Sequence, residues 1–422
     1  MDVIADLHIH SRYSRAVSKK MKIEEIVKFA KMKGLHIMGT GDFTHPKWLK
    51  ELQEKLTFFP DEQIYFYNGI FFVLSTEVCT AFEKSGKKHL IHHVILAPNF
   101  EVVKQINSRL SKYGSLSWDG RPVLEMTAAE LVEEVMEVSE LNEIFPAHAW
   151  TPWFSLFGEF SGFDTIEDCY EDMLPKIHAL ETGLSSDPAM NWRLSSLDRF
   201  TLLSNSDSHS FWPWRIGREA NVFSMDKVSY REIIRAIREK RIKFTIEVDP
   251  AYGKYHWSGH RHCNICLSPS EALKFNNICP VCGRKLTKGV AQRVEELADR
   301  PEGYVPATAI PFVSLLPLSE IIAKVIGAKR CSDKKVWMLY NKLIFKFGTE
   351  YNVLLWASRE QLAACVGERL AEAIIRVRER KIKILPGYDG VYGKIIIFPE
   401  EEKEREGERG QGKHQTTLAD FY

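Results

Sequence analysis

The stretch DVIADLHIH at residues 2–10 is the starting point for predicting the fold of this chain. It begins as a short apolar run, which is typical of a buried strand, and it ends on two histidines two positions apart. Side chains two apart on a strand point the same way, so His8 and His10 can reach one metal ion together. Two histidines alone are equally compatible with ordinary packing. Whether they form a metal site depends on which residues occur in the rest of the chain.

The pattern that follows this stretch continues to about residue 250. Short apolar runs, typical of buried strands, alternate with amphipathic segments such as 23–33, 127–139 and 230–240. Such alternation indicates a parallel sheet, either a barrel or a doubly wound sheet. About seven repeats of strand and helix favour the barrel. We therefore expect an α/β domain at residues 1–250.

The amino-acid composition excludes few classes of protein. Lys plus Arg number 57 and Asp plus Glu 56, so net charge gives no sign of a nucleic-acid partner, although a local basic patch is compatible with a neutral total. The N-terminus does not resemble a signal peptide, and no apolar stretch approaches the roughly 20 residues that a membrane span needs. We expect a cytoplasmic, monomeric protein with no membrane partner.

Metal-ligand residues recur at the ends of the other expected strands. Imidazole and carboxylate groups in succession are not explained by packing, and such mixed sets commonly hold two or three divalent ions. Barrel enzymes place their chemistry at the C-terminal ends of the strands. The residues concerned are His8, His10, Asp42, Glu77, His93, His148, Asp207 and His209.

The order of these groups resembles the PHP (polymerase and histidinol phosphatase) superfamily of metal-dependent phosphoesterases, whose fold is a distorted (β/α)7 barrel. The resemblance covers residues 1 to about 245. It implies that His8, His10, Glu77 and Asp207 bind one metal, and that Glu77 bridges to a second metal held by His93 and His148. Zinc, manganese and iron all suit such ligands, with zinc or manganese expected.

The sequence departs from the superfamily at a third metal site. Two histidines usual there are replaced, near Ser14 and at Phe43, while His209 is retained. We expect two metal ions, with a third site left open. Two ions about 4 Å apart can activate a water molecule and clamp a phosphodiester, so no serine or cysteine nucleophile is required. Asp207, His209 and Asp42 are the candidate catalytic groups.

A second metal motif lies at residues 251–300. Cys263 and Cys266 form one close pair, and Cys279 and Cys282 form another after twelve residues. Two such pairs are typical of a tetrahedral structural zinc site, which leaves no open position for catalysis. We expect a small zinc-binding domain here, with nearby histidines as spare ligands or surface residues.

Residues 301–398 are predicted to be mostly helical. The segment 354–374 resembles one half of a helix-hairpin-helix DNA-binding unit, in which Gly367 forms the hairpin and Arg369 follows it; a plain helical packing domain is the alternative. Aromatic and basic residues close to the expected ligands could bind a DNA base or backbone, or could belong to the core. These candidates are Trp150, Trp212, Trp214, Arg215 and Arg218.

The last part of the chain, residues 399–422, is predicted to be a disordered tail that ends in a docking peptide. Residues 400–413 are charged or Gly-rich and cannot build a core. The final eight residues resemble the peptide that binds the sliding clamp (PCNA), with an aliphatic and an aromatic side chain on one face of a helical turn. Its expected contact residues are Gln415, Leu418, Phe421 and Tyr422.

All parts together are similar to the endonuclease Q family of DNA-repair nucleases. That resemblance implies cleavage of double-stranded DNA 5′ of a deaminated base (uracil, hypoxanthine or xanthine) or an abasic site, in a nucleoid-associated, archaeal setting. The alternatives are a PHP-type small-molecule phosphatase and an inactive DNA-binding accessory factor of the replisome. The zinc motif, the helical region and the clamp peptide argue against the first, and the intact ligand set argues against the second. No phosphate-binding loop typical of helicases is present.

Overall fold

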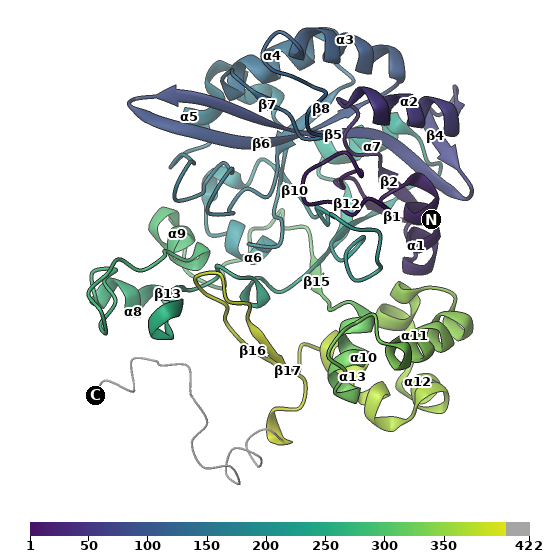
Figure 1. The fold of residues 1–422 in the computed structure, drawn as a ribbon, viewed down its shortest axis with the longest axis vertical. Coiled ribbons are helices and arrows are strands. Elements are labelled where there is room, and N and C mark those ends of the chain that lie inside the picture. The colour runs from purple at the N-terminus through teal and green to yellow at the C-terminus, as the bar shows by residue number, and fades with distance from the viewer. Residues whose placement is uncertain (402–422) are drawn as a thin grey trace.

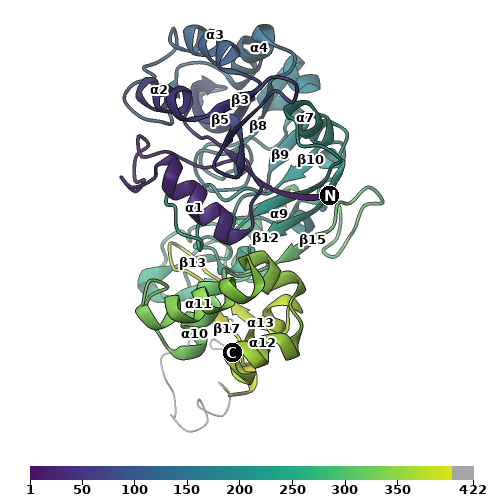
Figure 2. The same cartoon turned by 90° about the vertical axis from the view of Figure 1, so that its right-hand side faces the viewer.

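The computed structural model describes residues 1–401 of the 422-residue chain. Figures 1 and 2 show an N-terminal barrel-like domain above the rest of the chain, and in Figure 1 a small module lies at the lower left and a helical domain at the lower right. None of the helices among these residues is long and apolar enough to cross a membrane. The expected clamp-binding residues Gln415, Leu418, Phe421 and Tyr422 lie outside the described residues.

The N-terminal domain is built around a mixed sheet with the path β15-β12-β11-β1-β2-β5-β4-β3. Strands β1 and β2 are parallel, as are β2 and β5, whereas β11 runs antiparallel to both β1 and β12. The separate pair β9–β10 is parallel. The bounds are β1 Asp2–Asp6, β2 Ile37–Gly39, β3 Thr57–Phe59, β4 Ile64–Tyr67, β9 Ala179–Glu181, β10 Thr201–Leu203, β11 Ala220–Ser224 and β12 Ile242–Glu247.

The largest distortion of the barrel is a long antiparallel hairpin. Its strands are β5 (Ile70–Lys84) and β6 (Lys87–Ala97), and they stay in register from Leu74 opposite Ala97 to the turn. β6 also pairs antiparallel with β8 (Glu143–Pro146), and β5 pairs with the short β7 (Val123–Leu124). The hairpin brings residues from the middle of two strands to the end of the barrel where β1 and β2 finish.

Helices cover the outside of this sheet, and side chains cap their first turns. Thr127 and Glu130 form a reciprocal capping box at the start of α4, and Asn99 and Ser229 accept backbone N–H groups at the starts of α3 and α7. Their apolar faces pack on the strands. The bounds are α1 Ile23–Lys33, α2 Pro46–Lys55, α3 Phe100–Leu110, α4 Ala128–Val138, α5 Glu167–Tyr170, α6 Pro188–Asn191 and α7 Tyr230–Arg238.

The core lies on both faces of the sheet, because successive strand residues point to opposite sides. On β1, Ile4 belongs to one buried apolar cluster, while Val3 and Ala5 belong to another. The two clusters hold the strands from both faces, and polar side chains gather beyond the C-terminal ends of β1 and β2.

The small module after the barrel contains the cysteine pairs. It consists of the hairpin β13 (Ser258–His260) and β14 (Ile265–Leu267) with helices α8 (Pro269–Lys274) and α9 (Val290–Leu297). Its own buried apolar cluster is small and includes Cys279. A core of that size is typical of a module that needs a bound metal for stability.

The C-terminal region is tied to the barrel more closely than its expected boundary at residue 301 implies. Its first strand, β15 (Phe312–Ser314), extends the barrel sheet by pairing parallel with β12. The helices follow, and a second hairpin ends the described chain. Their bounds are α10 Leu318–Ile326, α11 Lys334–Phe347, α12 Arg359–Val366, α13 Glu368–Arg378, β16 Lys383–Leu385 and β17 Lys394–Ile396.

A buried ion pair joins the helical domain to the barrel. Lys33 Nζ at the end of α1 lies 2.8 Å from Glu350 Oε1, and both side chains are almost completely buried. Glu350 also accepts hydrogen bonds from Leu318 N and Tyr340 Oη. Because a buried carboxylate and ammonium are costly unless paired, this contact fixes how the two domains meet.

Candidate active site

One group of metal-ligand side chains gathers at the C-terminal end of the barrel. His8, His10, Glu77 and Asp207 each offer a ligand atom, and all four atoms lie within 4.8 Å of one another. His10 Nε2 lies 3.0 Å from Asp207 Oδ1 and 3.2 Å from Glu77 Oε2. The first three side chains are buried, whereas the Asp207 side chain is 27% exposed. The four side chains expected to bind the first metal therefore lie together, with Asp207 on the open side of the group.

A second group shares Glu77. Its members are Glu77, His92 and His148, again within 4.8 Å. His92 Nδ1 lies 2.7 Å, and His148 Nε2 3.0 Å, from Glu77 Oε1, whereas the first group approaches Glu77 Oε2. The two oxygens of one carboxylate thus face two neighbouring sites, which is the arrangement that a bridging ligand requires.

The expectation that His93 serves the second site is not met, and His92 takes its place. Opposite β5, His92 pairs with Cys79 and His93 with Val78, so His92 lies on the same face of the hairpin as Glu77 and His93 on the other. His93 is fully buried against Tyr170, and neither of its ring nitrogens has a hydrogen-bond partner among the described residues. Burial lowers the pKa of His93 to about 3.

Buried carboxylates behind the histidines fix the direction of their rings. Glu181, at the end of β9, accepts from His8 Nδ1 at 3.0 Å, and Asp42 accepts from His10 Nδ1 at 3.1 Å. With Nδ1 used as a donor, Nε2 of each ring is left as the metal-binding nitrogen. His8 Nε2 is buried without a hydrogen-bond partner, as expected of an atom aimed at an ion.

Asp42 was expected among the catalytic groups, but the structure places it behind the site. It is completely buried and also accepts from Ser11 N and from Ser14 Oγ at 2.8 Å. With its oxygens bound to these donors and to His10, it cannot reach a substrate. Asp42 is a positioning residue for His10. Glu181 has the same role for His8. In the sequence it is one acidic residue at a strand end, which does not by itself predict a contact with His8.

The electrostatics of the cluster favour cations. Burial opposes the charged form of Glu77, yet His92, Arg121 and the other nearby donors hold its pKa well below the usual range. The pKa of Asp207 is lowered in the same way, against burial, by His10 and the neighbouring histidines. Burial would lower the pKa of His8, but the charge of Glu181 raises it well above its usual value. Ionised carboxylates surrounded by imidazoles fit divalent metal ions.

Two further groups lie at the mouth of the cluster. His209 is about one-third exposed, and its Nδ1 donates to the Asp207 carbonyl oxygen at 2.9 Å. Its ring packs on His10 with a centroid distance of 4.6 Å. Arg121 Nη1 lies 3.3 Å from Glu77 Oε2. Sequence reasoning missed Arg121, because it lies in a long loop between α3 and β7 that carries no recognisable motif.

The aromatic candidates for base binding are used in packing. Trp150 is 1% exposed, stacks near Phe157 and donates from Nε1 to Asn191, so it cannot reach a base. Trp212 and Trp214 stack on each other at 4.8 Å, and both contact Trp337 of α11. They are part of the contact between barrel and helical domain.

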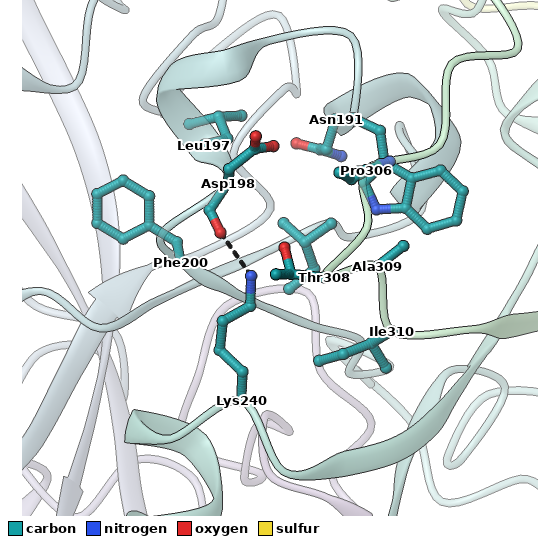
Figure 3. A pocket seen from close by; sticks show the side chains of 11 residues that line it. Asn191, Leu197, Asp198, Phe200, Lys240, Pro306, Thr308, Ala309 and Ile310 are labelled. Atoms are coloured by element: carbon teal, nitrogen blue, oxygen red, sulfur yellow. Dashed lines mark hydrogen bonds between the residues drawn. The ribbon is translucent and has the colours of Figure 1, made fainter.

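The basic candidates line a cavity of about 300 Å³ where the barrel, the segment before the zinc module and the helical domain meet. Arg218 donates to the Ser206 carbonyl oxygen, next to Asp207, and Arg215 lies beside it on the cavity wall. Tyr252 and Glu320 line the same cavity. By contrast, the cavity in Figure 3, near Asp198 and Lys240, measures only about 20 Å³, room for a water molecule but not for a substrate.

The helix-hairpin-helix candidates lie in the helical domain. Gly367 alone joins α12 to α13, with φ +85°, a conformation that favours glycine, and a Cβ there would meet no atom within 4 Å. The turn is therefore open toward solvent. Arg369, two residues on, forms a bidentate pair with Glu401 at 2.7 and 2.8 Å.

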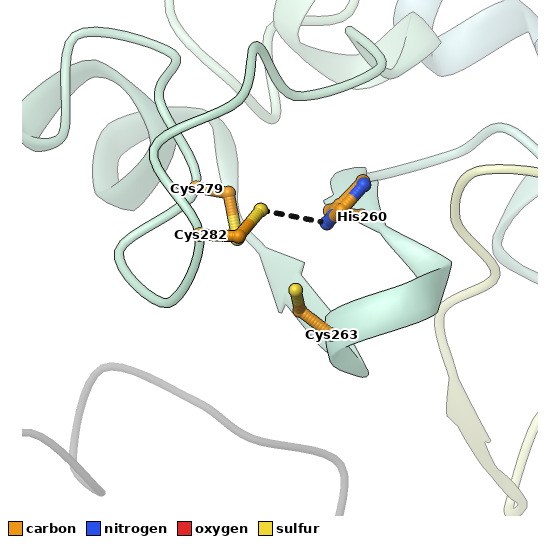
Figure 4. A group of neighbouring side chains, drawn as sticks. All are labelled: His260, Cys263, Cys279 and Cys282. Carbon is orange, nitrogen blue, oxygen red and sulfur yellow. Dashed lines mark hydrogen bonds between the residues drawn. The ribbon is translucent and has the colours of Figure 1, made fainter.

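The zinc motif is assembled with one change of ligand. Figure 4 shows Cys263, Cys279 and Cys282 facing His260, and these four residues offer ligand atoms within 4.8 Å. Cys266, expected as the fourth thiolate, is buried with its Sγ 3.8 Å from the Pro386 carbonyl oxygen. On the hairpin Cys266 pairs with Gly259 and His260 pairs with Ile265, so Cys266 and His260 lie on opposite faces of it. Three thiolates and one imidazole also make a closed tetrahedral zinc site.

These features define the class of protein. A distorted barrel of the PHP type, with a buried His and carboxylate cluster at the strand ends, is a metal-dependent phosphoesterase fold. Among solved structures, the chain is similar to the lesion-specific endonuclease PfuEndoQ from Pyrococcus furiosus, with 38% identity, 96% of this chain and 97% of that chain covered, and a TM-score of 0.86. The chain belongs to the endonuclease Q family, which confirms the expected class of metal-dependent endonuclease.

Two other proteins also match this chain over almost its whole length. An endonuclease Q structure in complex with a 27-mer duplex carrying an abasic lesion at the active site is 38% identical, with 95% of this chain and 98% of that chain covered and a TM-score of 0.84. The uncharacterized protein YqxK of Bacillus subtilis is 29% identical, with 93% of this chain and 99% of that protein covered.

The helical domain has its own match. Residues 317–381 match the family described as MJ0043 C-terminal domain. The uncharacterized protein MJ0043 of Methanocaldococcus jannaschii is 37% identical over 258 residues, which are 60% of this chain, and the match spans 32% of the length of that relative.

Proposed function

We propose that the protein is a DNA-repair endonuclease that hydrolyses the phosphodiester bond 5′ of a deaminated base or an abasic site in double-stranded DNA. The observation that carries this proposal is the Glu77-centred double cluster within a chain that matches endonuclease Q over almost its whole length. The substrate follows the relative whose complex contains a duplex with an abasic lesion at the active site.

Three side chains at the mouth of the cluster have separate tasks in the proposed reaction. Divalent ions bound there would activate a water molecule and neutralise charge on the scissile phosphate. Asp207, as the partly exposed ligand, marks the side from which the phosphate enters. Arg121, within 3.3 Å of Glu77, is placed to hydrogen-bond a non-bridging phosphate oxygen. His209 lies beside them, where its Nε2 can hydrogen-bond the leaving oxygen.

DNA contacts beyond the cluster are assigned to two regions. The cavity wall with Arg215 and Arg218 adjoins the backbone of Ser206 and can bind phosphate or a displaced nucleotide. The open turn at Gly367 offers backbone N–H groups to a phosphate without reading sequence. We also propose that the C-terminal peptide around Gln415 and Phe421 recruits the enzyme to the sliding clamp, a proposal that rests on the sequence.

End-labelled duplexes that differ only in one residue test this function. The set contains uracil, hypoxanthine, xanthine, an abasic site and an undamaged base at the same position, each with manganese, zinc or magnesium. We expect a single nick 5′ of the lesion and none in the undamaged duplex. Intact DNA under every metal, together with turnover of a small phosphomonoester, would favour a small-molecule phosphatase instead.

A further inference from the structure

One loop of the barrel carries a metal ligand near its start and contacts the helical domain farther along. It spans residues 204–219, between β10 and β11. Asp207 lies near its beginning, whereas Trp212 and Trp214 pack on Trp337 of α11. The same loop therefore reaches both the metal-ligand cluster and the surface on which the helical domain docks.

The backbone of Asp207 is held through its two neighbours. Its φ is +45°, in the left-handed region that is uncommon for a residue other than glycine. His10 N donates to the carbonyl oxygen of Ser208, the residue after it, at 3.0 Å. Ser206, the residue before it, is bound by a buried carboxylate. The place of the Asp207 carboxylate thus depends on contacts that its neighbours make.

That buried carboxylate is Asp6, at the end of β1, and it binds two parts of the loop together. It is completely buried. Its Oδ1 accepts from Ser206 N at 3.1 Å, and its Oδ2 accepts from Ser206 Oγ and, at 2.9 Å, from Gly217 N. Arg218, next to Gly217, donates from Nη2 to the Ser206 carbonyl oxygen at 3.0 Å. A shift of Gly217 would therefore be passed on to Ser206 and the metal ligand beside it.

Gly217 is also the point where the helical domain reaches this network. Its carbonyl oxygen accepts from Tyr351 Oη, and the Tyr351 side chain is buried. The φ of Gly217 is +58°, and a Cβ there would lie 2.9 Å from Leu35 Cδ1 and 3.0 Å from Tyr351 Oη. Glycine thus lets the barrel backbone and the tyrosine hydroxyl meet directly.

The buried ion pair between the domains holds the same loop at a second point. Lys33 Nζ, which is paired with Glu350, also donates to the Pro213 carbonyl oxygen at 2.9 Å. Glu350 immediately precedes Tyr351, so one short segment of the helical domain makes both contacts. Because a buried charge is costly once its partner leaves, a movement of this segment would carry the loop with it.

We propose that Tyr351 of the helical domain is a positioning residue for the metal ligand Asp207. Its hydroxyl holds Gly217, and Gly217 and Asp6 together hold the residue that precedes the ligand. The docked helical domain thereby sets the metal affinity of the barrel. The inference rests on the proposed function, because it takes Asp207 as a ligand of the metal ions that act in cleavage.

The test measures manganese affinity by calorimetric titration into the chelator-treated full chain. Tyr351→Phe removes the hydroxyl and keeps the ring over Lys33. We expect its manganese Kd to rise about 3-fold or more, and that of Asp6→Asn about 10-fold or more, because loss of such supports weakens metal binding. The double variant should bind manganese no more weakly than Asp6→Asn, because both changes break the same chain of contacts.

Tyr230→Phe is the matched control. Tyr230 of α7 is equally buried, and its hydroxyl also donates to a backbone carbonyl oxygen, that of Leu141 at 2.9 Å, outside the loop at 204–219. Both tyrosine variants should lose thermal stability, and only Tyr351→Phe should lose manganese affinity. An unchanged Kd in Tyr351→Phe, or an equal rise in both tyrosine variants, would overturn the positioning role. Nicking of a lesion duplex is scored separately, so a parent chain that binds manganese without nicking would count against the proposed function alone.

Discussion

The substitution Glu181→Gln tests whether a buried carboxylate sets the metal affinity of the site. Glu181 is completely buried and accepts hydrogen bonds from His8 Nδ1, Asn205 Nδ2 and His148 N. A glutamine offers one oxygen and one NH₂ group, so at least one of these donors would face another donor. His8 would also lose the charge that orients its ring. Loss of such a support typically weakens metal binding about 10- to 100-fold, or about 1.4 to 2.7 kcal/mol.

Metal affinity of this variant is measured by calorimetric titration of manganese or zinc into the chelator-treated full chain. Glu143→Gln is the control, because Glu143 is equally buried and paired with His178 and Arg238, but lies at the start of β8, away from the cluster. Both variants should lose thermal stability, and only Glu181→Gln should lose metal affinity. Unchanged affinity in Glu181→Gln would refute the positioning role; equal loss in both would mean that the effect is general destabilisation.

Three other predictions follow from the same geometry. His92→Ala should lower the amount of metal bound per chain in elemental analysis, whereas His93→Ala should not; a loss only in His93→Ala would show that the face of β6 is assigned incorrectly. Cys282→Ser and His260→Ala should release zinc from the small module and lower its melting temperature, whereas Cys266→Ser should keep the zinc. Zinc loss in Cys266→Ser but not in His260→Ala would show that the four cysteines, and not His260, bind the zinc. Burial, together with Asp187 among its neighbours, raises the pKa of Glu247 to about 8. Its protonated form stabilises the fold fully below the ordinary value of 4.5, and that contribution is lost as pH rises through 8. Glu247→Gln should therefore melt at a higher temperature than the parent at about pH 9 and show a smaller difference at about pH 5; equal pH dependence in both would contradict the buried neutral carboxyl.

Much of the site could be predicted from the sequence, because most of its ligands follow short apolar strands; Glu77 instead lies in the middle of the long strand β5. His8, His10, Glu77, His148 and Asp207 all lie at or near the end of the barrel where β1 and β2 finish, and the structure brings them together. A strand-end pattern is local information. It needs no knowledge of which strand pairs with which.

The features that the sequence did not predict depend instead on contacts between segments that lie far apart in the chain. Choosing between His92 and His93 needs the register of β6 against β5, which one residue of slip would reverse. The exchange of Cys266 for His260 depends on the pairing of β13 with β14. Arg121 and Glu181 act through contacts far apart in the chain, and the packing of Trp212 and Trp214 against Trp337 depends on where the helical domain docks.

The Glu77-centred cluster is expected to cut DNA with the help of bound metal. The most direct measurement is the nicking of an end-labelled duplex with one lesion, with manganese and with excess chelator, by the unchanged protein and by Asp207→Asn. We predict one nick next to the lesion that chelator abolishes and that added manganese restores. Asp207→Asn should bind the duplex without nicking it. Nicking that persists in chelator, or at the parent rate in Asp207→Asn, would contradict this prediction.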